Sequence, residues 1–478
     1  MEKSEQMIGN KYAPKDILNY LNSTENKENI KIFFSGIGGI SMSAIAAALK
    51  QKGYTIGGSD IKDSSHEDVQ KLREIGIEVS SSHKSENVEG YDLLVYMARI
   101  KADNPEIIRA QELNIPIIKR TQMLGALTHS YKTSIGIAGT HGKSSVTSMT
   151  SEIFMRANTD PTFFIGAVYP PVNSAYKVGD GDYFILEADE SYEQFFNFFP
   201  NISVILNIEM DHPDYFRDLQ HVISAFEQYL SNTSDTAVIN ADDKNALKAA
   251  KSFNKKIITY GINNQNADIT AKNIDYPNLF PEFDIFTNGS QYAHIKLSIP
   301  GEFNIYNALA AAGVAYACGI DGGAVEAGLN IFKGASRRFE YKGDLKNGAK
   351  IYEDYAHHPT EVKKTLMSLS NMKNDAQKNL WCVFQPHTYS RTHELLDDLC
   401  EALTHADKLI ITEIYSATEK NIYNISSKDI AEKIKTENCV YIKDFEQIAE
   451  YLKENASPED IILLMGAGDI NNLTKFLI

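Results

Sequence analysis

The sequence predicts an α/β protein of three domains, each built around a mainly parallel sheet. Three observations favour this fold class. The chain has 478 residues, which exceeds one ordinary core and suggests about three domains of about 150 residues each. Apolar strand-like segments alternate with helical stretches, as in βαβ units. Two of the strand–helix junctions are rich in glycine, as phosphate-binding turns are.

The composition excludes several classes of function. Hydrophobic residues make up 43% and charged residues 23% of the chain, which is typical of a globular protein. A formal net charge of -16 argues against nucleic acid or an anionic membrane as the main partner. The 4 cysteines have no CxxC or metal-ligand spacing, so we interpret them as free thiols in a reducing compartment. The N-terminus has no signal-peptide pattern, and no segment approaches the ~20 apolar residues of a bilayer span, so we expect a soluble cytoplasmic protein.

The first domain is predicted for residues 1–127. Short apolar segments there alternate with helical stretches, and the first segment leads into a glycine turn and an Ala-rich helix at Met42–Lys50. This alternation indicates a parallel sheet. The expected strands are Ile30–Ser35, Tyr54–Gly58, Gly76–Ser80, Leu93–Tyr96 and Pro116–Ile118.

The glycine turn of this domain resembles a dinucleotide-binding fingerprint. Its glycines are Gly36, Gly38 and Gly39, but Ser41 occupies the third glycine position of GxGxxG. Asp60 lies near the sequence distance at which an acidic residue binds ribose. A diphosphate can rest on the N-terminus of the following helix, whether it belongs to NAD or to another nucleotide. A tight turn without a ligand is the alternative interpretation.

The second domain is predicted for residues 128–334. A strand from Thr133 leads into a glycine-rich loop and then into an amphipathic helix that ends near Ala157. Residues 261–299 have a β-rich pattern. The other expected elements are strands Tyr183–Ala188 and Ile202–Ile208 and a helix at Tyr306–Cys318.

The glycine-rich loop is the strongest single indication of function. Backbone N–H groups of such a loop bind phosphate oxygens, and the next helix directs its positive end at them. Lys143 can bridge the β- and γ-phosphates of ATP, and the Ser144 hydroxyl can bind Mg²⁺. Ile137 replaces the first glycine of the strict GxxxxGK[ST] pattern, so a chance GKS is the alternative. The loop consists of Gly139, Thr140, His141, Gly142, Lys143, Ser144 and Ser145.

Acidic residues follow two later strands of this domain. Glu187, Asp189 and Glu190 come at the end of one strand, and Asp211 and His212 follow the other. Because the carboxyl ends of parallel strands meet at one edge of a sheet, these side chains are expected beside the phosphate loop. Carboxylate and imidazole groups there are suited to bind Mg²⁺ around ATP. Solvated acidic loop ends are the alternative.

The third domain is predicted for residues 335–478, where strands and helices alternate again. The expected strands are Lys350–Asp354, Leu380–Gln385, Lys408–Glu413, Val440–Ile442 and Ile461–Met465, and helices are expected to begin at Thr360, His393 and Ser427. Alternation of this kind indicates a second Rossmann-like sheet.

Basic side chains and histidines mark the third domain as part of a site. Arg337 and Arg338 lie at its hinge, where an arginine can reach a nucleotide phosphate across a cleft. His357 follows one strand, and His387 and Arg391 follow the next, as candidates to hold a carboxylate or move a proton. A surface arginine pair and core histidines are the alternatives.

Taken in order, these motifs resemble the Mur ligases of bacterial cell-wall synthesis, from Phe33 to Ile470. The resemblance implies a Rossmann-like UDP-binding first domain, a P-loop ATPase-like central domain and a Rossmann-like C-terminal domain that binds an amino acid. The motifs are SGIGGISMSAIA at 35–46, DNPEI at 103–107, GTHGKSS at 139–145, EADES at 187–191, NIEMDHPDYF at 207–216, PGEFNIYNALAA at 300–311, RRFE at 337–340, DYAHHPTEV at 354–362, FQPHTYSRT at 384–392 and GAGDI at 466–470.

The resemblance also implies roles for individual residues. The UDP of UDP-N-acetylmuramate would lie on Gly36, Gly38 and Gly39, with Asp60 beside it. ATP would lie on Gly139–Ser145, with its metals on Ser144, Glu187 and His212. Adenosine would contact Asn304 and Asp354, and the ATP phosphates would contact Arg338. The L-alanine pocket would be formed by Tyr355, His357, His387 and Arg391, with His357 or His387 as the general base.

The activity implied is ATP-dependent ligation of L-alanine to UDP-N-acetylmuramate through an acyl phosphate, in peptidoglycan precursor synthesis. A sister branch, the murein peptide ligases, attaches a recycled peptide to the same sugar nucleotide, but the segment 384–392 fits the alanine branch better. An NAD-dependent oxidoreductase leaves the phosphate loop unexplained, and a non-catalytic sensor does not need Lys143. We expect small-molecule partners without nucleic acid or membrane, in a monomer or homodimer.

The sequence departs from the family pattern at three places. Tyr192 follows Ser191 where an aspartate is usual, and Thr388 stands where an arginine is frequent. Tyr96-Met97-Ala98 replaces Ser-Ser-Ala in the first domain. The change at Thr388 concerns a possible anchor for a carboxylate, and the change at residues 96–98 concerns the binding of uridine.

Overall fold

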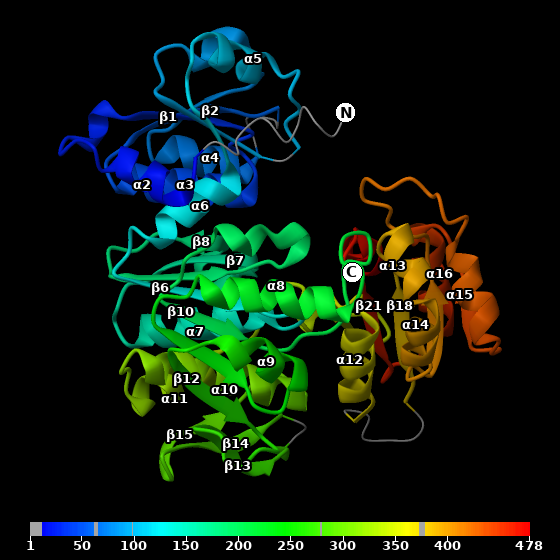
Figure 1. Cartoon of the computed structure of the whole chain (residues 1–478). Helices are drawn as coiled ribbons and strands as arrows, with labels where there is room; N and C mark the ends of the chain where they lie inside the picture. Colours follow the sequence, from blue (N-terminus) through cyan, green and yellow to red (C-terminus); the bar gives the residue numbers. More distant parts are fainter. Residues whose placement is uncertain (1–11, 62–65, 98, 278–279, 372–377) are drawn as a thin grey trace.

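The computed structural model of the chain contains three separate sheets (Figure 1). The strands of these sheets lie within residues 31–119, 133–296 and 340–465. The proposed domain limits at 127 and 334 fall between these ranges. The structure describes residues 12–61, 66–97, 99–277, 280–371 and 378–478.

The first domain is a five-stranded parallel sheet with the strand order β3-β2-β1-β4-β5. Its order reverses at β1, which lies between β2 and β4. A ligand of an open parallel sheet binds at such a switch point, above the carboxyl ends of the strands. The elements are α2 (Pro14–Leu21), β1 (Lys31–Ser35), α3 (Ile40–Gln51), β2 (Thr55–Ser59), α4 (Glu67–Glu74), β3 (Glu78–Ser80), β4 (Leu93–Tyr96), α5 (Pro105–Glu112), β5 (Ile117–Lys119) and α6 (Arg120–Thr128).

The central domain has a ten-stranded sheet with the order β15-β14-β13-β12-β11-β10-β6-β9-β7-β8. The strand before the phosphate loop, β6, lies between β10 and β9 and is parallel to both, so their carboxyl ends share one edge. The β-rich segment 261–299 forms antiparallel strands at the far end. The elements are β6 (Thr133–Ala138), α7 (Lys143–Arg156), β7 (Thr162–Tyr169), β8 (Ser174–Lys177), β9 (Tyr183–Glu187), β10 (Ile202–Ile205), α8 (Leu219–Ser231), β11 (Thr236–Asn240), α9 (Lys244–Ala249), β12 (Lys256–Gly261), β13 (Ile269–Asp275), β14 (Glu282–Thr287), β15 (Ser290–Lys296), α10 (Glu302–Ala317) and α11 (Gly322–Ile331).

The third domain has a six-stranded sheet with the order β16-β17-β21-β18-β19-β20. Only its edge pair β16–β17 is antiparallel among the described strands. The elements are β16 (Glu340–Asp344), β17 (Lys350–Asp354), α12 (Pro359–Asn371), β18 (Leu380–Phe384), α13 (Tyr389–Glu394), α14 (Leu396–Leu403), β19 (Lys408–Ile411), α15 (Ser427–Ile434), β20 (Cys439–Tyr441), α16 (Phe445–Asn455), β21 (Ile461–Met465) and α17 (Thr474–Leu477).

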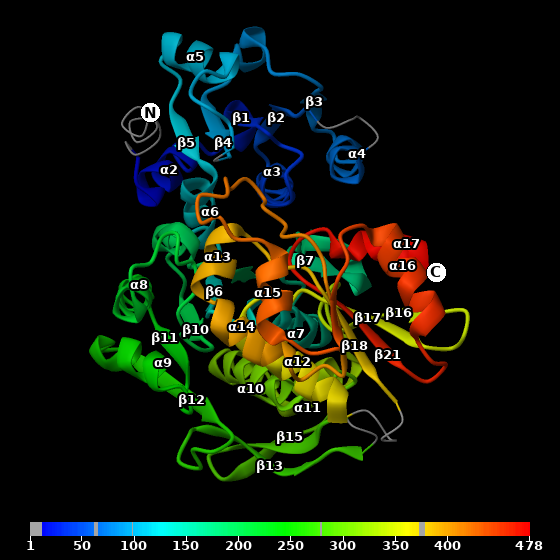
Figure 2. The same cartoon turned by 90° about the vertical axis from the view of Figure 1, so that its right-hand side faces the viewer.

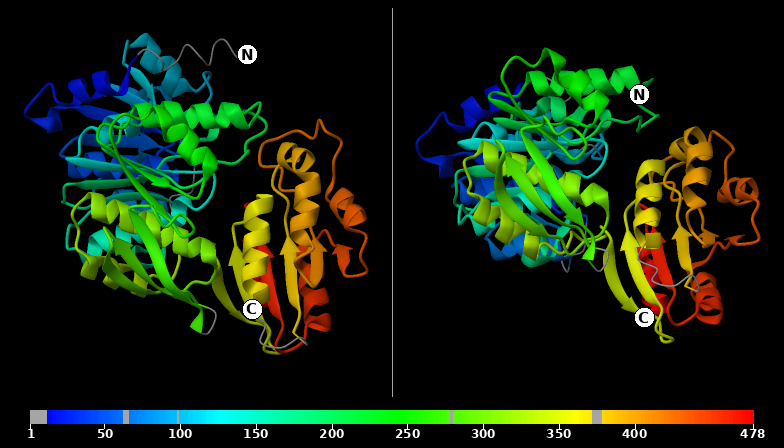
Figure 3. Two further views of the ribbon diagram at one scale, coloured as in Figure 1. Left: turned by 60° about the horizontal axis from the view of Figure 1, so that its bottom comes forward. Right: turned by 90° about the horizontal axis from the view of Figure 1, so that it is seen from below.

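The two outer domains attach to the central domain in different ways. One apolar cluster is continuous between the first and central domains, where Leu124 of α6 and Phe195 belong to the same buried group. The apolar clusters of the third domain contain only residues of that domain, within the part of the chain that the structure describes. The third domain stands in front of the central sheet in Figure 2 and beside it when seen from below in Figure 3. Its contacts with the central domain are therefore mainly polar.

Most expected strands lie within a few residues of their predicted places, but one helix prediction was wrong. The helix expected from His393 is two short helices, α13 and α14, which break at Leu395. The first of them begins earlier because the Thr388 side chain accepts a hydrogen bond from the Arg391 N–H as its N-cap. Ala98, one of the residues at which the sequence departs from the family pattern, lies outside the described residues. Among those residues no helix is long and apolar enough to cross a bilayer.

Candidate active site

The phosphate loop joins the end of β6 to α7, whose first residue is Lys143. Gly142 precedes that helix with φ 87°, in the left-handed region that glycine adopts without steric strain. A Cβ at this position would also lie 2.7 Å from Oδ1 of Asn307. The backbone therefore requires glycine here, and it leaves the N-terminus of α7 open to an anion.

Asn207, at the end of β10, holds the loop in this shape. Its Oδ1 accepts a 2.8 Å hydrogen bond from the His141 N–H, its Nδ2 donates to the His141 carbonyl at 3.1 Å, and its carbonyl accepts from the Thr140 N–H at 3.0 Å. We did not single out Asn207 from the sequence. The signal that could have revealed it is its place immediately after a buried strand beside β6.

Lys143 is fixed by a carboxylate of the neighbouring strand end. Its Nζ donates to Glu190 Oε2 at 2.7 Å and to the Gly139 carbonyl at 2.7 Å. Burial opposes the charge of this ammonium group, but Glu190 and its acidic neighbours outweigh it and raise the pKa of Lys143. Lys143 is therefore a permanent cation at the mouth of the loop.

Two residues expected to bind metal meet at the start of α7. The Ser144 hydroxyl donates to Glu187 Oε2 at 2.9 Å, and the Gly166 N–H donates to the same oxygen at 2.7 Å. From the third domain, Arg338 Nη2 reaches Ser144 Oγ at 3.4 Å. Side chains that are 194 residues apart in sequence therefore come together at the phosphate loop.

The two arginines at the hinge make different contacts. Arg337 Nε contacts Glu353 Oε1 at 2.6 Å, and its Nη2 donates to the carbonyls of Gly466 and Gly468 at 2.9 Å. Arg337 thus joins strands of its own domain, whereas Arg338 points at the loop. The Nε of Arg338 is buried and has no hydrogen-bond partner among the described residues.

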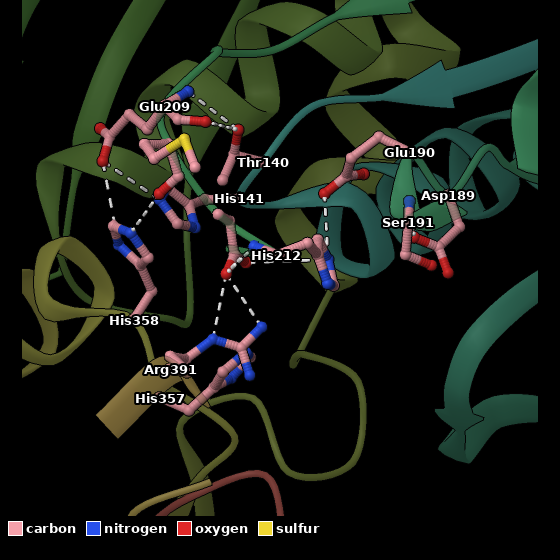
Figure 4. A network of polar contacts seen from close by, with 12 residues as sticks. Thr140, His141, Asp189, Glu190, Ser191, Glu209, His212, His357, His358 and Arg391 are labelled. Atoms are coloured by element: carbon pink, nitrogen blue, oxygen red, sulfur yellow. Dashed lines mark hydrogen bonds and ion pairs between the residues drawn. The ribbon is translucent and has the colours of Figure 1, made fainter. Parts of the chain in front are cut away.

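His212 lies with two carboxylates in a second cluster near the loop (Figure 4). The ligand atoms of Asp189, Glu190 and His212 all lie within 4.8 Å of one another. Glu190 Oε1 is 3.8 Å from His212 Nε2, and it is buried without a hydrogen-bond partner among the described residues. Oxygen donors with one imidazole suit Mg²⁺ or Mn²⁺ better than a thiophilic metal.

His141 of the phosphate loop lies beside Glu209 and His358 (Figure 4), and it forms an ionic contact with Glu361 of the third domain. Its Nδ1 is 3.2 Å from Glu361 Oε1, and its Nε2 is 3.4 Å from Glu209 Oε2. Thr360 donates to Glu209 at 2.5 Å, and His358 Nε2 is 3.1 Å from the Met210 carbonyl. Burial opposes protonation, but the two carboxylates outweigh it and raise the pKa of His141 to about 9. A protonated histidine thus bridges both domains.

Arg391 makes the second contact between these domains. Its Nε and Nη2 donate to Asp211 Oδ1 at 3.0 and 2.9 Å, and its Nη1 donates to His387 Nδ1 at 3.1 Å. Burial opposes ionisation of Asp211, but the guanidinium holds the pKa of that carboxyl well below its usual range. The expected carboxylate anchor therefore already has a buried counter-ion from the central domain.

His357 and His387 differ in the nitrogen that carries the proton. His357 Nδ1 is 3.0 Å from the Tyr355 carbonyl, which can only accept, so its Nδ1 donates and its Nε2 keeps the lone pair. His387 Nδ1 faces the Arg391 donor, so its proton is on Nε2. Burial, with Arg391, lowers the pKa of His357 to about 3 and that of His387 to about 4. Both rings are neutral at neutral pH.

Asn304 and Asp354 line a cavity of about 330 Å³ beside the loop. Asn304 Nδ2 donates to the Pro300 carbonyl at 2.7 Å, which fixes its amide. Asp354 accepts from the N–H groups of Phe339 and Ala356, both at 2.8 Å, and burial raises its pKa to about 6. The cavity also contains Tyr306 and ends at Gly142, so it can hold a nucleoside whose phosphates reach the loop.

In the first domain, the glycine turn lies at the carboxyl end of β1. Gly36 has φ 83°, and the Gly38 N–H donates to Asp60 Oδ2 at 2.8 Å. Asp60 follows β2, so it braces the turn at the switch point of the sheet. Gly36, Gly38, Gly39 and Asp60 are thus brought together, far along the chain from the phosphate loop.

Comparison with known proteins shows which family has this arrangement of three domains. Residues 31–132 match the model "Mur ligase family, catalytic domain", residues 137–315 match "Mur ligase middle domain", and residues 337–468 match "Mur ligase, glutamate ligase domain". A protein of Acetivibrio thermocellus named UDP-N-acetylmuramate–L-alanine ligase is 42% identical over 92% of this chain and 93% of its own length. One of the same name from Clostridium tetani is 43% identical over 92% of this chain and 96% of its own length.

The chain belongs to the Mur ligase family. The predicted family and fold class are confirmed, and with them an ATP-dependent ligase that forms an amide bond. A crystal structure of UDP-N-acetylmuramate-alanine ligase from Thermotoga maritima has a TM-score of 0.75 and 28% identity, covering 94% of this Mur ligase and 98% of that chain. A murein peptide ligase from Psychrobacter arcticus has a TM-score of 0.69 at 23% identity and 98% coverage of its chain, and shares the fold.

Proposed function

We propose that this Mur ligase joins L-alanine to UDP-N-acetylmuramate with ATP, through an acyl phosphate, as a step of peptidoglycan precursor synthesis in the cytoplasm. The observation that carries the proposal is the meeting of Lys143, Ser144, Glu187 and Arg338 at one phosphate loop. Phosphoryl transfer depends mainly on positioning and charge, and this set supplies both. Its expected substrates are small molecules.

Lys143 and Arg338 are the cations proposed to bind the ATP phosphates. Lys143 extends from the first residue of α7, and the unpartnered Nε of Arg338 offers a donor on the opposite side of Ser144. Adenosine would occupy the cavity that contains Asn304 and Asp354. Placed between these groups, the γ-phosphate would face the end of β9.

The donor set also fits a divalent metal. Ser144 and Glu187 form one group, and Glu190 with His212 forms another, in which a buried carboxylate oxygen lacks a hydrogen bond among the described residues. Mg²⁺ on these residues would neutralise charge on the phosphate oxygens.

The lactyl carboxylate of the sugar nucleotide attacks the γ-phosphorus, the bond from that phosphorus to the β,γ-bridging oxygen breaks, ADP leaves, and an acyl phosphate forms. The amine of L-alanine then attacks the acyl carbon, and inorganic phosphate leaves. The amine must lose a proton, and we assign that step to His357, because its Nε2 keeps a lone pair while its Nδ1 donates to the Tyr355 carbonyl. His387 has the opposite tautomer and instead orients Arg391, which would keep its bonds to Asp211 and bind the alanine carboxylate with its remaining N–H groups.

The murein peptide ligases are the second candidate function, because they share this fold. The curated relatives described above have the alanine ligase name and cover more than nine-tenths of both chains, which favours the first. The decisive measurement is phosphate release with ATP, UDP-N-acetylmuramate and a series of amines. Release that requires L-alanine supports the proposal, whereas release that requires a tripeptide and ignores L-alanine refutes it.

A further inference from the structure

A second large cavity, of about 780 Å³, opens between the first domain and the central domain. The first domain lines it with basic residues from the region of β4, β5 and α6, and the central domain contributes the segment after β9. This concentration of positive charge is unusual in a chain with a formal net charge of -16. The first domain contributes Arg99, Lys101, Lys119 and Arg120, and the central domain contributes Tyr192, Gln194 and one carboxylate, Glu193.

Arg120, the first residue of α6, spans this cavity. Its Nη1 donates to Ser41 Oγ at 2.8 Å, and its Nη2 donates to Gln194 Oε1 at 2.5 Å. Ser41 lies in the first turn of α3, immediately after the glycine turn. The guanidinium therefore lies beside the N-terminus of α3 and faces a residue of the central domain.

Both of these hydrogen-bond acceptors are neutral. Among the described residues, no carboxylate lies within ion-pair distance of Arg120, and Asp189 attracts its charge only from farther away, whereas Arg391 pairs with Asp211 and Lys143 with Glu190. Desolvation of a cation is unfavourable unless an anion compensates it. A planar guanidinium bound only by a hydroxyl and an amide, in a cavity of this size, is suited to receive a phosphate by two parallel hydrogen bonds.

We propose that Arg120 binds the diphosphate of the sugar nucleotide, opposite the glycine turn, and directs the sugar through this cavity toward the phosphate loop. The inference rests on the proposed function and adds a residue that neither the motifs nor the resemblance indicated. The amides of the turn would contact the diphosphate from one side and the guanidinium from the other. On binding, Arg120 would exchange its hydrogen bonds to Ser41 and Gln194 for hydrogen bonds to the diphosphate.

The test is binding of UDP and of uridine, measured without ATP or amine. Calorimetry should show UDP binding about 10- to 100-fold weaker in Arg120→Met, the loss expected for charge-assisted hydrogen bonds. Ligand-observed NMR should show uridine binding unchanged, because uridine has no phosphate. Arg120→Lys should recover part of the UDP affinity. In turnover assays the KM for UDP-N-acetylmuramate should rise, while those for ATP and L-alanine stay the same.

The matched control is Arg109→Met, because Arg109 is an arginine of the same domain that already pairs with Glu89 and Glu112. It should bind UDP like the natural protein. Unchanged UDP affinity in Arg120→Met would overturn the assignment, and so would an equal loss for UDP and uridine, which indicates a structural role. Weaker binding of UDP-N-acetylmuramate alone would move the contact to the lactyl carboxylate and also overturn it. If the natural protein binds no UDP, the proposed function fails first and this inference with it.

Discussion

Lys143 and Glu190 form an ion pair of 2.7 Å at the phosphate loop. Replacing Lys143 with Ala should lower ATP-dependent phosphate release by at least about 1000-fold, because catalysis of phosphoryl transfer comes mainly from electrostatic stabilisation of the transferred group. Coupled phosphate release with both substrates measures the effect. Lys132→Ala is the control, since Lys132 is exposed and pairs only with Asp182. Near-normal turnover in Lys143→Ala would remove the phosphate-loop assignment.

The two neutral histidines should respond differently to substitution. His357→Gln should lower kcat by about 100- to 10,000-fold, the range for loss of a general base, with little change in the KM for L-alanine. His387→Gln should chiefly raise that KM, because Arg391 loses the nitrogen that accepts from its Nη1. Steady-state kinetics over a range of L-alanine concentrations separates the two effects. The reverse pattern would assign the base to His387.

At the scale of elements, the phosphate loop and the start of α12 are joined by one buried imidazolium. The pKa of His141 is raised from 6.5 to about 9, so its contribution to docking is complete below pH 6.5 and is lost as the pH rises through about 9. The shift corresponds to on the order of 3 kcal/mol at 1.36 kcal/mol per pKa unit for both carboxylates together, and the part that comes from Glu361 stabilises docking of the third domain. We expect the thermal midpoint of the natural protein to fall between pH 6.5 and 9 by more than that of His141→Gln.

His294→Gln is the control for this pH effect. His294 also has a raised pKa, from hydrogen bonding to Asp284 and then Glu282, but it lies half-buried on β15, away from the third domain. By the same linkage its substitution should also flatten the pH dependence of the midpoint, but by less than His141→Gln, because solvent screens the partly exposed His294 pairs. If the thermal midpoint falls equally between pH 6.5 and 9 in the natural protein and in His141→Gln, another group controls docking.

At the scale of the whole molecule, the third domain is the part that can move. It shares no apolar cluster with the central domain within the described residues, and the Asp211–Arg391 pair is one of its main attachments. Asp211→Asn leaves a buried guanidinium without its counter-ion, a change of about 3–5 kcal/mol. Small-angle X-ray scattering should therefore give a larger radius of gyration for Asp211→Asn, together with a lower kcat.

The control for domain docking is Glu401→Gln, because Glu401 forms an exposed ion pair with Lys363 of the same domain. It should change neither the scattering nor the rate. An unchanged radius of gyration in Asp211→Asn would show that the remaining contacts, those of His141, Thr360 and His358, are sufficient to hold the third domain.

Contiguous features were accessible from the sequence. Gly139–Ser145 is one segment between a buried strand and a helix, and a strand such as Leu93–Tyr96 is defined by its own apolar side chains. Local backbone preferences and periodicity encode such elements within a few residues. The early start of α13 depends on a single capping hydroxyl at Thr388, and the break before α14 lies at Leu395; the simple helical pattern revealed neither.

The pairing of distant side chains was decided only by the tertiary structure. The residue types alone do not distinguish Arg337 from Arg338, and the family resemblance indicated Arg338 for the ATP phosphates; in the fold Arg337 binds Glu353 and Arg338 reaches Ser144. It shows two histidines, whose tautomers depend on whether a carbonyl or a guanidinium lies beside Nδ1. The sequence by itself determined the family, the three sheets and the phosphate loop, because these follow from local pattern and order. Protonation, counter-ions and domain docking depend on distances between residues that are far apart along the chain, and only the folded arrangement fixes those distances.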